Sequence, residues 1–98
     1  MIDILRSKFN ISGMDIFLPS DETLTVSIVV LPGSSMMSLA CTVDPLRAAN
    51  RIAGREVFDW SVHTFDDNAA VLSSGLAVSG STRFDPSQRR DMLIVIAG

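Results

Sequence analysis

The chain has 98 residues, a formal net charge of −3 and a hydrophobic content of 47%. This length suits one small domain, and the composition is that of an ordinary globular protein. An acidic chain lacks the excess of basic side chains from which nucleic-acid binding draws most of its affinity, so these residues alone should not bind DNA strongly. Arg47, Arg51 and Arg55 are spaced four residues apart, which predicts a solvated stripe on a helix.

Membrane and secretory classes are also disfavoured. No apolar run in the sequence approaches the roughly 20 residues that span a bilayer, and no signal-peptide pattern opens the chain. Cys41 is the single cysteine, so an intrachain disulfide is impossible and we expect a cytoplasmic protein without a membrane partner. The mean hydropathy of +0.34 is high for a domain this small, which favours strands that are covered on both faces.

Residues 1–23 show no regular hydrophobic period and are interpreted as an amino-terminal extension. Residues 24–31 are rich in β-branched side chains and predict a strand whose second half is apolar on both faces. A sharp break over residues 32–35 follows, with a proline, a glycine and two serines. The domain proper is therefore expected over residues 24–98.

A helix is predicted over residues 35–53, because apolar residues recur there at steps of three and four. Gly54 can adopt the left-handed conformation that ends a helix. Pro45 interrupts the pattern. We favour a helix that kinks at this proline, and the alternative is two helices in series with Asp44 capping the second.

Residues 58–65 alternate between apolar and polar side chains, which predicts a strand with one buried face. His63 falls on the polar face and is therefore expected at the surface. After a turn, residues 71–72 and 76–78 are predicted as short strands around a bend at residues 73–75.

Residues 85–87 indicate a short helical turn, and residues 92–97 form an almost unbroken apolar run. This run predicts a central strand that is covered on both faces. The order of elements is that of a doubly wound, flavodoxin-like α/β fold with a mostly parallel sheet. A doubly covered strand needs a further helix to cover it, so we interpret the chain as the amino-terminal part only of such a fold.

No constellation for catalysis, metal binding or a cofactor is evident. His63 is the single histidine, the glycine-flanked serine of a nucleophile elbow is missing, and acidic residues are scattered. Asp66 and Asp67 are typical of a turn. Cys41 lies within the predicted helix and not at its start, so we interpret it as a small packing residue and not as a reactive thiol.

The best candidate for binding is the turn that joins the first strand to the helix. Gly33, Ser34 and Ser35 lie where main-chain N–H groups at a helix start can hold an anion or a ligand oxygen. Gly98 follows the last strand, at the carboxyl edge where such sheets place their ligands. The alternative is that the turn is an ordinary junction with Ser35 as the helix cap.

Two runs carry a specific resemblance to a known family: residues 31–40 (LPGSSMMSLA) and residues 43–51 (VDPLRAANR). They resemble the amino-terminal sensor domain of AraC-family transcription regulators, which is similar to PfpI and to class I glutamine amidotransferases. Residues 58–60 (FDW), 73–76 (SSGL) and 91–98 (DMLIVIAG) fit the same pattern. The resemblance covers residues 24–98.

The resemblance implies a homodimeric sensor whose small-molecule effector is an amino acid or an amine metabolite. DNA would be bound only through a carboxyl-terminal helix-turn-helix domain that these residues do not contain. Related PfpI-type enzymes carry a glutamate where Ser38 stands here, which argues for a ligand-binding and non-catalytic domain. Two rivals stay open: part of a PfpI-type hydrolase, deglycase or amidase, and a free-standing interaction module.

Overall fold

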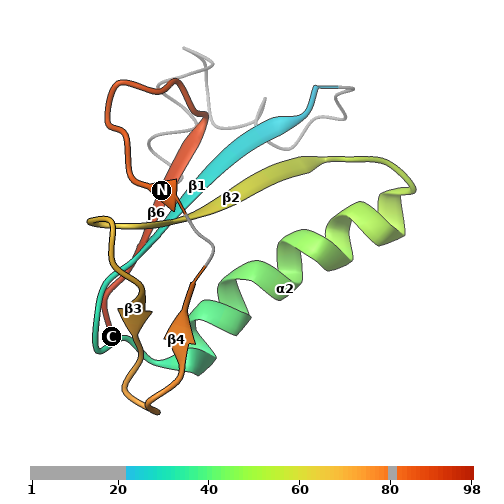
Figure 1. The fold of residues 1–98 in the computed structure, drawn as a ribbon. Coiled ribbons are helices and arrows are strands. Elements are labelled where there is room, and N and C mark those ends of the chain that lie inside the picture. Colours follow the sequence, from blue (N-terminus) through green and yellow to red (C-terminus); the bar gives the residue numbers. More distant parts are fainter. Residues whose placement is uncertain (1–21, 80–81) are drawn as a thin grey trace.

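The computed structural model describes residues 22–79 and 82–98, and Figure 1 shows their arrangement. The elements in these residues are β1 (Leu24–Val30), α2 (Met36–Ala53), β2 (Phe58–Thr64), β3 (Ala70–Val71), β4 (Ala77–Val78), β5 (Thr82–Arg83) and β6 (Met92–Ile96). β5, β2, β1 and β6 form a sheet in this order, and all neighbours in it are parallel. The predicted α/β class with a mostly parallel sheet is confirmed. Residues 1–21 of the expected extension lie outside the described residues.

The core lies between β1 and α2. Val26, Ile28 and Val30 are at most 1% exposed and point toward the helix, on what we call the helix face of the sheet. Ile28 lies between Val62 of β2 and Ile94 of β6 in the register. Burying an aliphatic side chain of this size contributes about 1.5–3 kcal/mol to the stability of the fold. Because β1 supplies three such side chains, the predicted first strand is the centre of the core.

The helix begins and ends where the sequence indicates. The Ser35 side chain accepts a hydrogen bond from the Ser38 N–H at 3.3 Å, and Gly54 takes the left-handed φ of 68°. One helix runs through Pro45, so the alternative of two helices in series is wrong. The proline leaves the Cys41 carbonyl without its helical donor, and both residues are exposed, so water can hydrate that carbonyl.

No residue of α2 is fully buried, since its inner side chains are only half-covered by the sheet. Cys41 lies on the outer side and is exposed. The expectation that it packs in the interior is therefore wrong. A helical period identifies the positions that share a face, but the orientation of the whole helix decides which face meets the sheet.

Asn50 fastens the end of the helix to the start of β2. Its Nδ2 donates to the Phe58 carbonyl at 2.9 Å, and its Oδ1 accepts from the N–H groups of Val57 and Phe58, both at 2.8 Å. The amide thus satisfies three main-chain groups where the chain turns back into the sheet.

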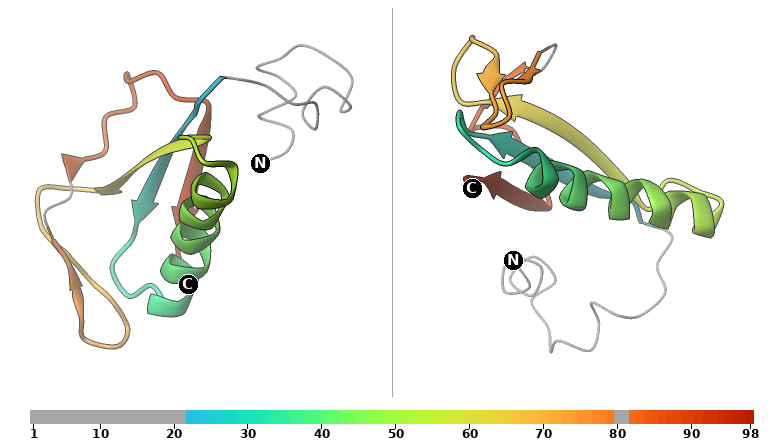
Figure 2. Two further views of the ribbon diagram at one scale, coloured as in Figure 1. Left: turned by 90° about the vertical axis from the view of Figure 1, so that its right-hand side faces the viewer. Right: turned by 90° about the horizontal axis from the view of Figure 1, so that it is seen from below.

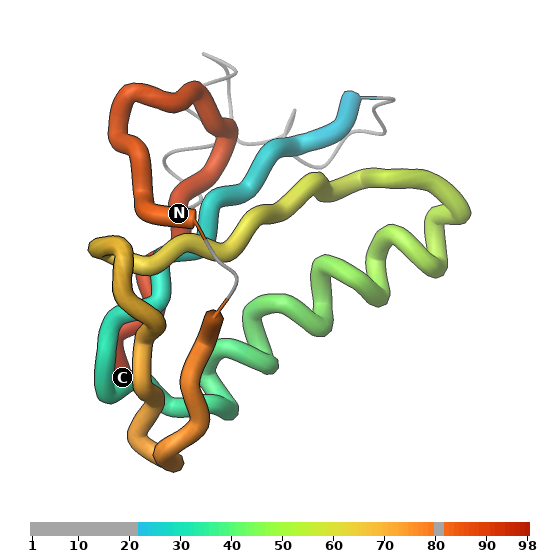
Figure 3. The backbone as a smooth tube through the Cα atoms, in the orientation of Figure 1, coloured from blue at the N-terminus to red at the C-terminus, as the bar shows by residue number. Residues whose placement is uncertain are grey.

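The opposite surface of the sheet, which we call the far face, is crossed by the connection from β5 to β6, residues 84–91. Figure 3 traces this connection in orange and red. The guanidinium carbon of Arg90 lies 4.6 Å from the centre of the Phe84 ring, and the Arg90 Nε donates to the Ser27 Oγ at 2.9 Å. Within the segment, Asp85 accepts hydrogen bonds from the Ser87 hydroxyl and N–H, which hold the pKa of Asp85 below its usual value.

This crossing buries His63, which is 4% exposed. The imidazole Nδ1 lies 3.0 Å from the Thr82 Oγ1, the Nε2 lies 2.8 Å from the Ser61 Oγ, and the ring meets Phe84 edge to face. The prediction of a surface histidine is wrong, because Thr82 of the neighbouring strand β5 and Phe84 of the crossing segment cover the His63 ring. His63 joins β5 to β2.

β6 lies at the edge of the described sheet, beside β1. Val95 is 52% exposed, while Ile96 is 6% exposed and belongs to the core. The prediction that this strand is central and covered on both faces is therefore wrong for the described residues. Its helix-facing side chains pack on the core, but the crossing segment reaches Ser27 and His63 and leaves Val95 open.

β3 and β4 form a separate antiparallel ribbon, with Ala70 opposite Val78. The bend between them contains Gly75, whose φ is 91°, and this confirms the predicted pair of short strands. Leu72, at 5% exposed, packs in the core beside Ala70. At residues 85–88 the chain makes a turn, closed by the Gln88 N–H on the Asp85 carbonyl at 3.2 Å.

Candidate functional site

The carboxyl ends of β1 and β6 and the start of α2 meet at one end of the sheet (Figures 1 and 2). Gly33 shapes the turn there with a φ of 82°, a conformation that strongly favours glycine. Its N–H donates to the Val71 carbonyl at 2.8 Å, and the Ser73 N–H donates to the Ser34 carbonyl at 2.9 Å. The β3–β4 ribbon therefore braces the turn.

Ser34 faces the interior and is 1% exposed. Its Oγ lies 2.6 Å from the Leu31 carbonyl oxygen and 2.8 Å from the Ile96 carbonyl oxygen. Because a hydroxyl carries one proton, it donates to one of these oxygens at a time. The side chain thus ties the turn to the end of β6.

The other residues of the predicted binding set lie around this tie. Ser35 caps the helix, Ser38 is half-buried one turn later, and Gly98 follows β6 with open space where a side chain would begin. Within the described residues no hydrogen bond engages the main-chain N–H groups of Met36 and Met37, as is usual in the first turn of a helix.

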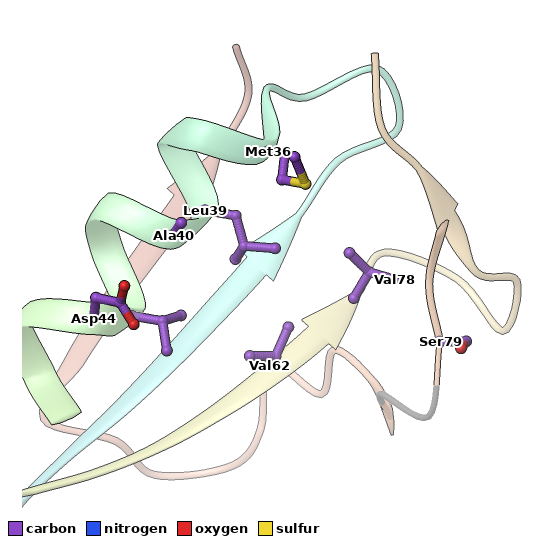
Figure 4. Close-up of a pocket in the computed structure, with 8 residues that line it drawn as sticks. Met36, Leu39, Ala40, Asp44, Val62, Val78 and Ser79 are labelled. Carbon is purple, nitrogen blue, oxygen red and sulfur yellow. The ribbon is translucent and has the colours of Figure 1, made fainter. Parts of the chain in front are cut away.

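A groove of about 410 Å³ opens beside this turn, on the helix face. Figure 4 shows its side chains: those of Leu39, Val62 and Val78 point into the space between α2, β2 and β4. It is lined by Met36, Leu39, Ala40, Val43, Asp44, Val62, Val78 and Ser79.

Asp44 is the one charged residue in this lining. Its Oδ1 lies 3.6 Å from the Arg47 Nε, and the two side chains are 69% and 56% exposed. An ion pair this open contributes little, so the Asp44 carboxylate can exchange this partner for a cationic ligand. The sequence showed the helical residues of the groove only as an apolar period that predicts a helix, and nothing in it indicated that β4 would leave them partly uncovered.

The far face holds the arrangement closest to a catalytic set. Ser61, His63 and Thr82 are hydrogen-bonded in series. The third member is a hydroxyl, which cannot stabilise an imidazolium as a carboxylate does. The groove lies on the other face of the sheet, where Val62 points. We therefore give these contacts a structural role.

Residues 22–79 and 82–98 contain no group of three or more histidine, cysteine, aspartate or glutamate side chains that could hold a metal ion. No helix in this part of the chain has the length and apolar character needed to cross a bilayer.

Comparison with known proteins gives relatives of one kind. No protein-family model and no solved structure matches the chain. It is 34% identical over 70 residues to the HTH-type transcriptional regulator CdhR of Pseudomonas aeruginosa, which covers 71% of this chain and 20% of CdhR. It is 31% identical over 74 residues to the HTH-type transcriptional regulator GbdR in two strains of that species, with 76% of this chain and 20% of GbdR covered. The chain is thus similar to transcriptional regulators and spans about a fifth of their length.

Proposed function

We propose that residues 24–98 are the amino-terminal part of a PfpI-like, class I glutamine amidotransferase-like sensor domain of an AraC-family transcription regulator. The observation that carries the proposal is the similarity to CdhR and GbdR, which are both HTH-type transcriptional regulators. The parallel sheet with its helix supports the sensor fold. The comparisons give no support to a PfpI-type hydrolase, and Ser38 stands where the resemblance expects the glutamate of that enzyme.

The effector in this proposal is a small molecule with an ammonium group, an amino acid or an amine. The groove supports this class, because its apolar wall suits a hydrocarbon body and Asp44 suits a cation. The first turn of α2 begins beside the groove at Met36, so its N–H groups suit a carboxylate. Ser35, Ser38, Gly98 and the main chain of Gly33 do not line the groove; they stay proposed ligand-facing groups at the adjoining turn, where Ser34 positions them.

The proposed mechanism is a shift between two arrangements of a homodimer. A ligand shifts such an equilibrium only through a difference in its affinity for the two arrangements. DNA would be contacted by the helix-turn-helix part of the intact cytoplasmic regulator, since the net charge of −3 does not suit this domain to DNA. No cofactor takes part.

The test is calorimetric titration of the chain with a panel of amino acids and amines, with operator binding by the intact regulator as a second readout. We expect one ligand class to bind, and Asp44→Asn to weaken it by about tenfold, as for a hydrogen-bonded charge partner. Asp67→Asn is the matched control, because it removes the same charge from an exposed turn outside the groove. If no member of the panel binds, or if both variants lose binding equally, the proposal is wrong.

A further inference from the structure

The groove between α2, β2 and β4 carries its charge at one end. The helical part of its lining consists of Met36, Leu39, Ala40, Val43 and Asp44, so Asp44 is the last of these residues along α2 (Figure 4). Because a helix rises about 1.5 Å per residue, the wall from Met36 to Asp44 is about 12 Å long. A small amino acid held at Asp44 would therefore leave most of this wall uncovered.

A ligand whose ammonium group lies at Asp44 finds no partner for a carboxylate beside it in the groove. In an α-amino acid the carboxyl carbon lies about 2.5 Å from the nitrogen, so this group would approach the Asp44 carboxylate, and like charges repel. The described lining contains no lysine or arginine, and Ser79 is its other polar residue. The open N–H groups at the start of the helix lie about 12 Å away, beyond the reach of an α-carboxylate.

Arg47 does not supply the missing partner inside the groove. Its Nε lies 3.6 Å from the Asp44 Oδ1, but its side chain is 56% exposed and is not part of the groove lining. An α-amino acid that bridged Asp44 and Arg47 would place its carboxylate on this open surface, where ion pairs contribute little. The groove thus favours a cation that has no carboxylate next to it.

The size of the groove indicates how long the rest of the ligand is. Its volume of about 410 Å³ holds on the order of ten non-hydrogen atoms, at roughly 30 Å³ each as for water. We propose that the effector is an extended aliphatic amine, with its ammonium group at Asp44 and a chain of about six to eight carbons lying along α2 toward Met36. This inference rests on the proposed function, because it names the chemical class that the sensor takes.

The experiment is calorimetric titration of the 98-residue chain with amines of increasing length. From butylamine through hexylamine to octylamine, the affinity should rise about twofold per added methylene, because full burial would give about fourfold and the groove is open on one side. Pentylamine and norleucine form a matched pair, since norleucine is pentylamine with a carboxylate on the carbon that bears the nitrogen. Pentylamine should bind about tenfold more tightly than norleucine, whose carboxylate would lack a partner.

A substitution halfway along the wall tests the orientation of the ligand. Ala40 is exposed, lines the groove, and lies one turn from Asp44, about 6 Å toward Met36. Butylamine ends before this point and octylamine passes it, so Ala40→Leu should weaken octylamine by about fivefold and butylamine by less than about twofold. Ala53→Leu is the matched control, because it makes the same change at the exposed last residue of α2, outside the groove. Far-ultraviolet circular dichroism checks that both variants keep the wild-type fold.

The possible outcomes separate this inference from the proposed function. Norleucine binding as tightly as pentylamine, or equal losses for butylamine and octylamine in Ala40→Leu, would overturn the extended amine. The sensor role would still stand if an amino acid or a short amine changed operator binding by the intact regulator. Amines that bind as expected but leave operator binding unchanged would refute the sensor role and leave the assignment of the groove standing. Binding by no amine and no amino acid would refute both.

Discussion

Replacement of Ser34 by alanine tests whether this residue holds the fold or the ligand. The change deletes a hydroxyl that lies 2.6 Å from the Leu31 oxygen and 2.8 Å from the Ile96 oxygen. Both oxygens keep a main-chain donor, since the Ser34 N–H reaches Leu31 at 3.3 Å and the Leu31 N–H reaches Ile96 at 3.0 Å. No acceptor is left wholly unpaired, so the loss should stay near one net hydrogen bond, about 1 kcal/mol and at most about 2.

Urea unfolding followed by the fluorescence of the single tryptophan, Trp60, measures this loss. Ser34→Ala should lower the midpoint without changing the slope, while Ser74→Ala at the exposed bend should stay within about 0.5 kcal/mol of the wild type. Effector binding by the folded Ser34→Ala variant should remain within a few-fold of the wild type. An unchanged midpoint together with lost binding would refute the reasoning and make Ser34 a ligand contact.

Three further predictions concern other parts of the molecule. Asn50→Ala removes three hydrogen bonds to the start of β2 and should lower the free energy of unfolding by about 2–3 kcal/mol; a loss below half of this in urea unfolding would contradict the fastening role. Cys41 should react with a thiol reagent in the native chain as fast as in urea, because it is exposed, and marked protection in the native chain would contradict this exposure. The pKa of the Asp85 carboxyl should lie below its usual value, and the Ser87→Ala substitution should raise this pKa again. Because the folded-state pKa is lowered, the stability that the carboxylate adds is present above the usual pKa of aspartate. This stability is lost as the pH falls through the lower, folded-state value. Nuclear magnetic resonance titration measures this pKa, and an equal pKa in both forms would refute the assignment.

Much of the fold follows from local sequence signals. The β-branched run at residues 24–30 forms the central strand, Ser35 and Gly54 bound the helix, and Gly75 sets the bend of the ribbon. Each of these features depends on the conformational preference of a few adjacent residues, which the sequence displays directly. The resemblance carried by residues 31–51 agrees with the kind of relatives found.

Tertiary structure alone decided what covers each face. Alternation in β2 places His63 and Trp60 on opposite faces of the strand. It does not reveal that β5 and residues 84–91 bury the histidine. The same holds for Val95, which is apolar yet open at the sheet edge, and for Cys41, which is small yet exposed. Periodicity determines which residues share a face because it is a property of the local backbone, whereas burial depends on segments that are distant in the chain and meet only in the folded molecule.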